Sequence, residues 1–318
     1  MAVIISKIFV VFLYIAIGFA AYRLKVFNDD SIIHLTKLLI YITCPALMLY
    51  SIGGAELNRS IMFNTVLMLA LAVFMYAISG FAVMWFARRR KAVAPLDANV
   101  ISLATSSSNT GFMGFPISQS VFGPTVLYYM IIQNVGLNLY MYTMGVWELN
   151  YKADESRGRK SARETLKSAA NPILISSLVA VVILFAGIRI PEYCMNIFET
   201  IGEATIPLSM ILVGVQLGAS RLSEVFKSRV VLLFTFINLI VIPAITFGIA
   251  MLLPIENIVK VTFVLSMCFP SAAIGVALSA SEGRNSLLYA ELVASTTLLS
   301  MITLPVWIMI ISNAFPLM

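Results

Sequence analysis

Charged residues are scarce in this sequence. Of its 318 residues, 11% are Asp, Glu, Lys or Arg, whereas 60% are hydrophobic. A soluble domain carries roughly 25% charged residues, so this chain cannot cover its whole surface with polar side chains. The shortage excludes an ordinary soluble domain and indicates a surface that faces lipid.

Histidine and cysteine are scarce as well. The chain has one histidine, His34, and three cysteines that lie far apart in apolar stretches, which favours neither a disulfide framework nor a metal site. It has no GxxxxGK[ST] loop and no HExxH motif, so ATP-driven pumping within this chain and zinc-protease chemistry are excluded. A lone histidine also offers no credible serine–histidine pair. We therefore expect no enzyme, no metal and no cofactor.

Long apolar stretches are what the sequence does have. At roughly 20 residues per span, the chain accommodates about ten transmembrane helices. We expect an all-α integral membrane protein. Its predicted spans lie at 3–22, 33–51, 61–86, 98–121, 124–149, 170–188, 195–217, 229–252, 257–280 and 287–312.

Basic residues mark one side of the predicted membrane. Most of the 21 lysines and arginines follow the odd-numbered spans, including those in the polar loop at 151–167. Basic loops stay in the cytoplasm, so we expect both termini outside and a multi-pass protein of the plasma or inner membrane. The net charge of +6 then reflects these loops, and we expect no nucleic-acid partner.

The two halves of the sequence resemble each other. TCPALMLYSIG at 43–53 matches TIPLSMILVG at 205–214, and SNTGFMGFPIS at 108–118 matches FPSAAIGVALS at 269–279, with offsets of 160 to 162 residues. Each repeat has an odd number of spans, so the second copy enters the membrane from the opposite side, as in many secondary transporters.

This repeat divides the chain into three predicted parts. They are a first five-helix repeat at 1–150, a cytoplasmic basic linker at 151–169 and a second, inverted five-helix repeat at 170–318.

One pair of matched segments contains helix breakers. In SSSNTGFMGFP at 106–116, each glycine costs about 1 kcal/mol in a helix, and Ser, Asn and Thr offer the backbone other hydrogen bonds. We expect the span at 98–121 to break near Asn109–Gly111, and the span at 257–280 to break at Pro270. Broken helices at membrane depth line a cavity or are buried, and their free N–H groups form an anion site. The alternative is a pair of proline kinks that allow close helix packing.

The breaks and the nearby polar residues provide the candidate site. We expect substrate binding at Asn109, Thr110, Gly111, Pro270, Ser271, Ala272, Asn134 and Asn138. Asn134 and Asn138 share a helix face, and they either line a polar path or join helices. Glu203 and Glu291 lie in apolar segments and are candidates for proton coupling. The alternative for both carboxyls is a helix-end position or a bond to a neighbouring helix.

The paired motifs resemble the auxin efflux carrier family. SNTGFMGFP, FPSAAIGVAL and EATIPLSMILVGVQLG carry the resemblance, which extends over essentially the whole chain. The family includes plant PIN auxin carriers and bacterial malonate carriers, and the short central loop here is similar to that of the bacterial members.

The resemblance implies a division into two domains. Spans 1, 2, 6 and 7 would form a scaffold, and spans 3–5 and 8–10 a transport domain that moves against it. The two broken helices would cross in the transport domain and bind an organic carboxylate there. Asn109 and Pro270 match the family's crossover asparagine and proline. The family also implies a homodimer formed through the scaffold.

We therefore predict a secondary active transporter of small organic anions, carboxylates such as malonate or auxin-like acids, with elevator-type alternating access. The lack of a dense carboxylate cluster at the predicted crossover favours coupling to protons. The fold of the family also resembles that of sodium-coupled bile-acid carriers, so a sodium-coupled carrier is one alternative. A passive anion channel and a ligand-binding membrane sensor are the others.

Overall fold

The computed structural model describes most of the chain, at residues 2–53, 58–152, 172–188, 190–220 and 228–317. Within these ranges the chain is helical, and its one extended pairing is an isolated bridge between Ser108 and Ser271. The all-helical prediction is confirmed for this part of the chain. The predicted basic linker at 151–169 lies outside the described residues, apart from its first two positions.

The first half of the chain runs from α1 to α8. Its η elements are π-helical turns, which are wider than an α-helical turn and often lie at functional sites. The elements are α1 (Ala2–Arg23), α2 (Asp29–Leu38), η1 (Leu39–Thr43), α3 (Cys44–Gly53), α4 (Arg59–Arg88), α5 (Pro95–Ser106), η2 (Thr110–Gly114), α6 (Phe115–Ile117), η3 (Ser118–Phe122), α7 (Pro124–Tyr140), η4 (Met141–Gly145) and α8 (Val146–Asn150).

The second half is helical as well. Its elements are α10 (Pro172–Phe185), α11 (Glu192–Glu203), α12 (Thr205–Ala219), α14 (Arg229–Phe236), η5 (Ile237–Val241), α15 (Ile242–Leu252), α16 (Asn257–Met267), α17 (Ile274–Ser281) and α18 (Ser286–Ala314).

Asparagine caps fix where two long helices begin. Asn58 accepts a hydrogen bond from the Ile61 N–H at 2.8 Å and starts α4. Asn285 accepts one from the Leu288 N–H at 3.1 Å and starts α18. An N-cap of this kind contributes about 1 kcal/mol, so local sequence sets these two boundaries.

Several helical segments are suited to a membrane. Among the described residues, six are long and apolar enough to cross one: Ser6–Arg23, Asp29–Gly53, Arg59–Arg88, Glu192–Ala219, Arg229–Leu252 and Ser286–Ala314. Two shorter helices, Pro172–Phe185 and Asn257–Met267, are also apolar. The chain is therefore a multi-pass membrane protein. The arrangement of ten spans in inverted repeats goes beyond these segments and stays a prediction.

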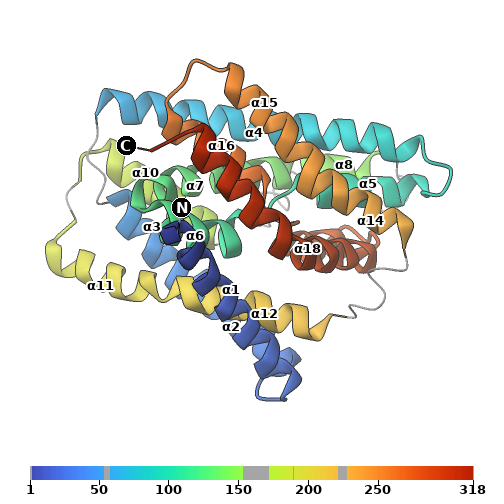
Figure 1. The fold of residues 1–318 in the computed structure, drawn as a ribbon, viewed down its shortest axis with the longest axis horizontal. Helices are drawn as coiled ribbons and strands as arrows, with labels where there is room; N and C mark the ends of the chain where they lie inside the picture. Colours follow the sequence, from blue (N-terminus) through green and yellow to red (C-terminus); the bar gives the residue numbers. More distant parts are fainter. Residues whose placement is uncertain (1, 54–57, 153–171, 189, 221–227, 318) are drawn as a thin grey trace.

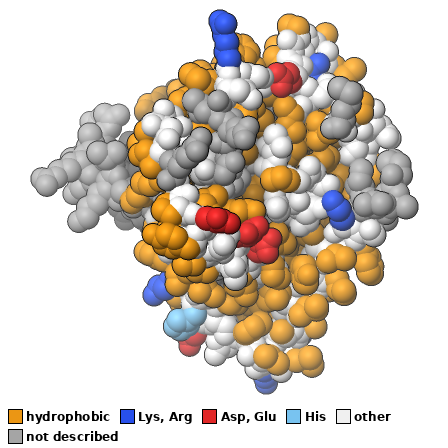
Figure 2. All heavy atoms as spheres, turned by 90° about the vertical axis from the view of Figure 1, so that its left-hand side faces the viewer, with side chains coloured by type: hydrophobic (Ala, Val, Ile, Leu, Met, Phe, Trp, Pro, Cys, Tyr) orange, Lys and Arg blue, Asp and Glu red, His pale blue; other side chains and the backbone are white. Residues whose placement is uncertain are grey.

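The outer surface is largely apolar. Phe9 is 66% exposed, Leu252 86% and Ile302 70%. Figure 2 shows a face on which hydrophobic side chains predominate and charged side chains are few. Soluble monomers rarely expose continuous apolar patches of more than a few hundred Å², so this surface suits contact with lipid.

The helices pack in two groups. In the first, α1 lies against α12, and α3 lies against α10 and α11. In the second, α4 packs on α5 and α7, α16 packs on α7 and α15, and α18 packs on α5, α14 and α17. Figure 1 shows α1, α2, α11 and α12 on the lower side of the molecule, with α4 and α15 on the upper side. The helix α12 also touches η2 and α6, so these elements lie where the two groups meet.

Glycine allows α1 and α12 to approach closely. A Cβ added to Gly18 would collide with the Ile211 carbonyl oxygen, and a Cβ added to Gly214 would collide with the Ile15 carbonyl oxygen. Small residues at helix crossings are common in membrane proteins, because packing rather than the hydrophobic effect joins helices there.

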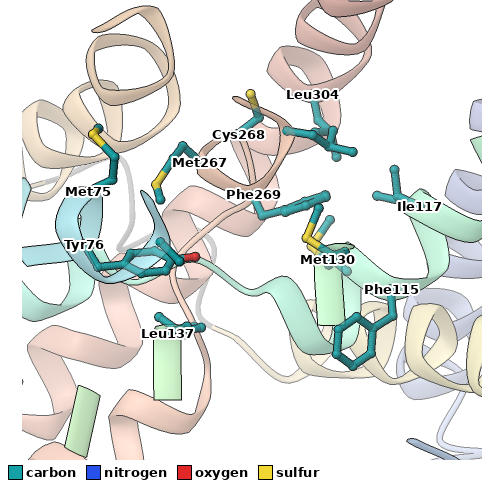
Figure 3. Close-up of a cluster of buried hydrophobic side chains, with 14 of the residues drawn as sticks. Met75, Tyr76, Phe115, Ile117, Met130, Leu137, Met267, Cys268, Phe269 and Leu304 are labelled. Atoms are coloured by element: carbon teal, nitrogen blue, oxygen red, sulfur yellow. The ribbon is translucent and has the colours of Figure 1, made fainter. Parts of the chain in front are cut away.

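A buried apolar cluster surrounds Phe269, the residue before Pro270. Figure 3 shows its ring pointing toward Met130 of α7 and Leu304 of α18. A Cβ on Gly114 would lie 3.2 Å from the Phe269 ring and 3.3 Å from the Met130 sulfur. Glycine at 114 thus leaves room for the ring, and the cluster fixes the chain before α17 against the π-helical turn η2.

Candidate functional site

The span predicted at 98–121 is interrupted in the structure. The helix α5 ends at Ser106, and the chain is non-helical at 107–109 before η2 begins at Thr110. The Asn109 Oδ1 accepts a hydrogen bond from the Phe112 N–H at 3.2 Å and caps the new helix. The break was expected near Asn109–Gly111. It lies slightly earlier because the Asn109 cap already starts the helix before Gly111.

The span predicted at 257–280 is also interrupted. The helix α16 ends at Met267 and α17 begins at Ile274. Pro270 lies between them, where it has no N–H to continue α16. The two interruptions thus occupy the positions that the internal repeat predicts.

The two interrupted segments meet. The Asn109 N–H donates to the Pro270 carbonyl oxygen at 2.7 Å, and the Ala272 N–H donates to the Ser107 carbonyl oxygen at 3.1 Å. Ser108 and Ser271 form an antiparallel bridge between these bonds. We call residues 107–109 and 270–272 the crossing. It satisfies backbone groups that the helix breaks leave without intrahelical partners.

The predicted backbone donors therefore divide into two sets. The N–H groups of Asn109 and Ala272 are used within the crossing. Within the described residues, the N–H groups of Gly111, Ala273 and Ile274 donate no hydrogen bond, and these three residues are only partly buried. The free donors at the starts of the two helices lie one or two residues beyond the crossing.

Ser271 provides a free hydroxyl at the same place. Its N–H donates to the Thr296 Oγ1 at 3.1 Å, but its own Oγ has no hydrogen-bond partner although the residue is fully buried. A buried polar atom without a partner is uncommon and costs about 1–3 kcal/mol. This oxygen is therefore a candidate to bond a ligand.

The predicted residues of α7 join the first helix break. The Asn134 Nδ2 donates to the Thr110 Oγ1 at 2.8 Å, and the Asn138 Nδ2 donates to the Asn134 Oδ1 at 3.0 Å. All three residues are buried. A Cβ on Gly111 would lie 3.7 Å from the Asn134 amide nitrogen. The structure thus brings Asn134 and Thr110 together beside Gly111, with Asn138 one helical turn away.

The two carboxyls predicted to couple protons have different surroundings. Glu203 is exposed at the end of α11, and Glu291 is partly buried in α18. Within the described residues, neither forms a hydrogen bond to the crossing. A coupling role for either one stays a prediction.

One buried carboxyl is not among the residues predicted from the sequence. Glu148 in α8 has an exposed fraction of 0%. It accepts hydrogen bonds from the Ser102 hydroxyl at 2.7 Å and from the Tyr140 hydroxyl at 3.0 Å. Because it lies at the end of a predicted span, its position in the sequence resembled that of an ordinary interfacial carboxyl.

A pocket of about 210 Å³ opens between α1, η3 and α12. Lys7, Tyr14 and Ser120 are among the residues that line it. Lys7 therefore lies in the same pocket as Ser120 of η3, which is at the C-terminal end of the helical segment that begins at Thr110. No group of three or more potential metal-binding side chains occurs in the part of the chain that the structure describes.

Comparison with known proteins defines the class. Residues 3–308 match the family model described as membrane transport protein. The chain therefore belongs to this family, which is the auxin efflux carrier family that its motifs resemble.

Relatives in bacteria and archaea are similar over most of their length. The chain is 23% identical to the "Uncharacterized transporter YfdV" of Escherichia coli (strain K12) over 299 residues, which cover 92% of each chain. It is 23% identical over 296 residues to an "Uncharacterized transporter" of Methanothermobacter thermautotrophicus, covering 92% of this chain and 93% of the relative. It is 25% identical over 215 residues to the "Uncharacterized transporter MJ1031" of Methanocaldococcus jannaschii, covering 66% and 68%.

Proposed function

We propose that this protein is a secondary active transporter of small organic anions, carboxylates such as malonate or auxin-like acids, driven by a proton gradient. The observation that carries the proposal is the crossing. Two interrupted helices meet there with free N–H groups at Gly111, Ala273 and Ile274 and a free hydroxyl at Ser271. Helix N-termini attract anions because their N–H groups and dipole both favour negative charge.

The anion binds beside the crossing. Its carboxylate accepts hydrogen bonds from the free N–H groups and from the Ser271 hydroxyl. Asn109 and Thr110 border the same site at the start of η2, and Asn134 positions Thr110 through its 2.8 Å hydrogen bond. A non-helical backbone is tolerated at membrane depth only where it is buried or lines a cavity, which supports this location.

The architecture we propose has ten spans in two inverted repeats, with both termini outside the cell membrane. The scaffold contains α1, α3, α10, α11 and α12. The transport domain contains α4, α5, α7 and α14 to α18. Support comes from the packing, since each set packs largely within itself. Alternating access moves the transport domain against the scaffold, and the scaffold surfaces of two copies form a homodimer.

Uptake into liposomes tests this function. Purified protein in liposomes should accumulate labelled malonate under an imposed pH gradient, and it should exchange internal for external malonate without a gradient. Uptake that requires a sodium gradient would replace the proton with sodium. Uptake that neither saturates nor exchanges would indicate a channel. Binding without any uptake would indicate a sensor.

A matched pair of serine variants tests the location of the site. Ser271 and Ser279 are both fully buried, and each has a hydroxyl without a hydrogen-bond partner. S271A should weaken malonate binding about fivefold, as expected for the loss of one hydrogen bond of about 1 kcal/mol. S279A, in α17, should leave binding unchanged. Equal effects of the two variants would place the anion elsewhere.

A further inference from the structure

A buried carboxyl lies near the crossing but outside the proposed anion site. Glu148 is closed to water in this conformation, with an exposed fraction of 0%. Burying an unpaired carboxylate is costly, so ionisable residues inside a membrane protein are candidates for function. The surroundings of Glu148 show which function suits it.

The carboxyl lies where α4, α5, α7 and α8 meet. Ser102 of α5 bonds one oxygen of Glu148 at 2.7 Å, and Tyr140 of α7 bonds the other at 3.0 Å. A Cβ on Gly80 of α4 would collide with both the Glu148 Oε1 and the Tyr140 hydroxyl. Glycine at position 80 therefore leaves space for this group of hydrogen bonds.

Each hydroxyl around Glu148 has a second acceptor. The Ser102 Oγ lies 2.7 Å from the Gly80 carbonyl oxygen. The Tyr140 oxygen lies 2.8 Å from the Ser106 Oγ, which itself lies 2.9 Å from the Ser102 carbonyl oxygen. An ionised Glu148 accepts a hydrogen bond from each hydroxyl. A protonated Glu148 donates to one of them, and that hydroxyl turns to its second acceptor. Both protonation states are hydrogen-bonded without movement of heavy atoms.

Other titratable and charged groups lie on the elements around Glu148. They include Tyr76 and Arg88 on α4, Asp97 on α5, Tyr140 on α7, Tyr142 on η4, Tyr151 after α8, and Glu282 and Arg284 after α17. Glu282 accepts from the Asn150 amide at 2.9 Å. Arg88 donates to Asn99 at 2.8 Å, Asp97 accepts from Asn285, and Arg284 donates to Asn150. Of these side chains, Tyr140 is hydrogen-bonded to the Glu148 carboxyl.

The hydrogen bonds of Glu148 lead to the residue that precedes the crossing. Tyr140 bonds Ser106, which is the last residue of α5. The next residue is Ser107, whose carbonyl oxygen accepts from the Ala272 N–H. A change in the protonation of Glu148 therefore alters hydrogen bonding at the end of the helix that leads into the anion site.

We propose that Glu148 takes up and releases the proton that drives transport. This inference rests on the proposed function, because only a proton-driven carrier needs such a residue. In uptake, a hydronium ion transfers a proton to the carboxylate, which leaves water and a neutral carboxyl group. In release, the proton returns to water. Since Glu148 is closed to water here, both exchanges take place in other conformations of the transport cycle.

The test uses E148Q in liposomes. Glutamine keeps the size of the side chain and both hydrogen-bonding functions, but it cannot release a proton. E148Q should exchange malonate across the membrane with no dependence on pH, and a pH gradient should drive no accumulation above the level seen without a gradient. E148D should restore some driven accumulation. E256Q is the matched control, because Glu256 also accepts from a serine hydroxyl but is exposed. It should accumulate malonate as the wild type does.

Each other outcome has a defined meaning. Accumulation driven by a pH gradient in E148Q would overturn the inference. If E203Q or E291Q loses that accumulation and E148Q keeps it, coupling belongs to Glu203 or Glu291 instead. If E148Q does not fold, Y140F and S102A replace it. Both remove one hydroxyl bond to Glu148 and should shift the pH at which transport is half-maximal, and unchanged pH profiles in both would refute the role. A wild-type protein that transports no carboxylate under any gradient would instead refute the proposed function.

Discussion

Asn109 is a position at which folding stability and anion binding can be separated. Its side-chain oxygen caps η2 through the Phe112 N–H at 3.2 Å, and its own N–H bonds the Pro270 carbonyl oxygen. In N109D the side chain keeps an oxygen for the cap, and the main-chain bond is unchanged. In N109A the cap is lost. The two variants thus remove different parts of what Asn109 provides.

The expected magnitudes differ for the two variants. Asp and Asn are about equally good N-caps, whereas Ala costs about 1 kcal/mol. N109D should therefore keep a midpoint of unfolding close to the wild-type value, and N109A should be less stable. Two negative charges about 4 Å apart repel by about 4 kcal/mol at an effective dielectric constant near 20. A carboxylate at the proposed site should then bind N109D roughly a thousandfold more weakly.

Thermal unfolding of the purified protein, with and without malonate, measures both quantities. At a concentration of about 100 times Kd, the ligand stabilises the wild type by about 2.7 kcal/mol and raises its midpoint. N109D should show no rise at that concentration, although its midpoint without ligand resembles that of the wild type. A rise in N109D equal to the wild-type rise would refute an anion site beside the crossing.

Glycine substitutions give further predictions, each read from the midpoint of thermal unfolding in detergent. Gly275→Ala forces the Tyr289 hydroxyl away from Ser107 at the end of α5. It should lower the free energy of unfolding by about 1–3 kcal/mol. The double variant G275A/Y289F, which removes that hydroxyl, should recover part of this loss. Gly214→Ala places a methyl group against the Ile15 carbonyl oxygen and should separate α1 from α12 at a similar cost; an unchanged midpoint would contradict the close packing. Gly248→Ala in α15 meets nothing within 4 Å and should stabilise the protein by about 0.5–1 kcal/mol.

Local sequence predicted the two helix interruptions because their cause is local. Pro270 has no N–H, and Asn109 caps a helix through its own side chain. Both effects act within a few residues, so they can be recognised without knowledge of the fold. The internal repeat then indicated that the two breaks are equivalent, and the structure places them in contact.

The free donors could not be chosen from the sequence. The Asn109 and Ala272 N–H groups looked as available as those of Gly111 and Ala273. They are used because each meets a carbonyl oxygen from the other interrupted segment, more than 150 residues away. That pairing depends on how the two halves pack, and no local pattern encodes it.

The contrast among the carboxyls has the same origin. The sequence predicts a coupling role for Glu203 and Glu291 because apolar residues surround them in the chain, yet Glu203 is exposed and Glu291 partly buried. Glu148 lies next to a polar stretch, but it is buried because three other helices bring Ser102, Tyr140 and Gly80 around it.

The sequence by itself determined that this protein is helical, lies in a membrane and breaks two of its helices at equivalent places. Composition, hydropathy and backbone chemistry act along the chain and need no tertiary contacts to be read. Only the tertiary structure decided which N–H groups remain for an anion and which carboxyl is closed to water. Burial and hydrogen bonding are properties of groups that meet in space, and here those groups come from helices distant in sequence.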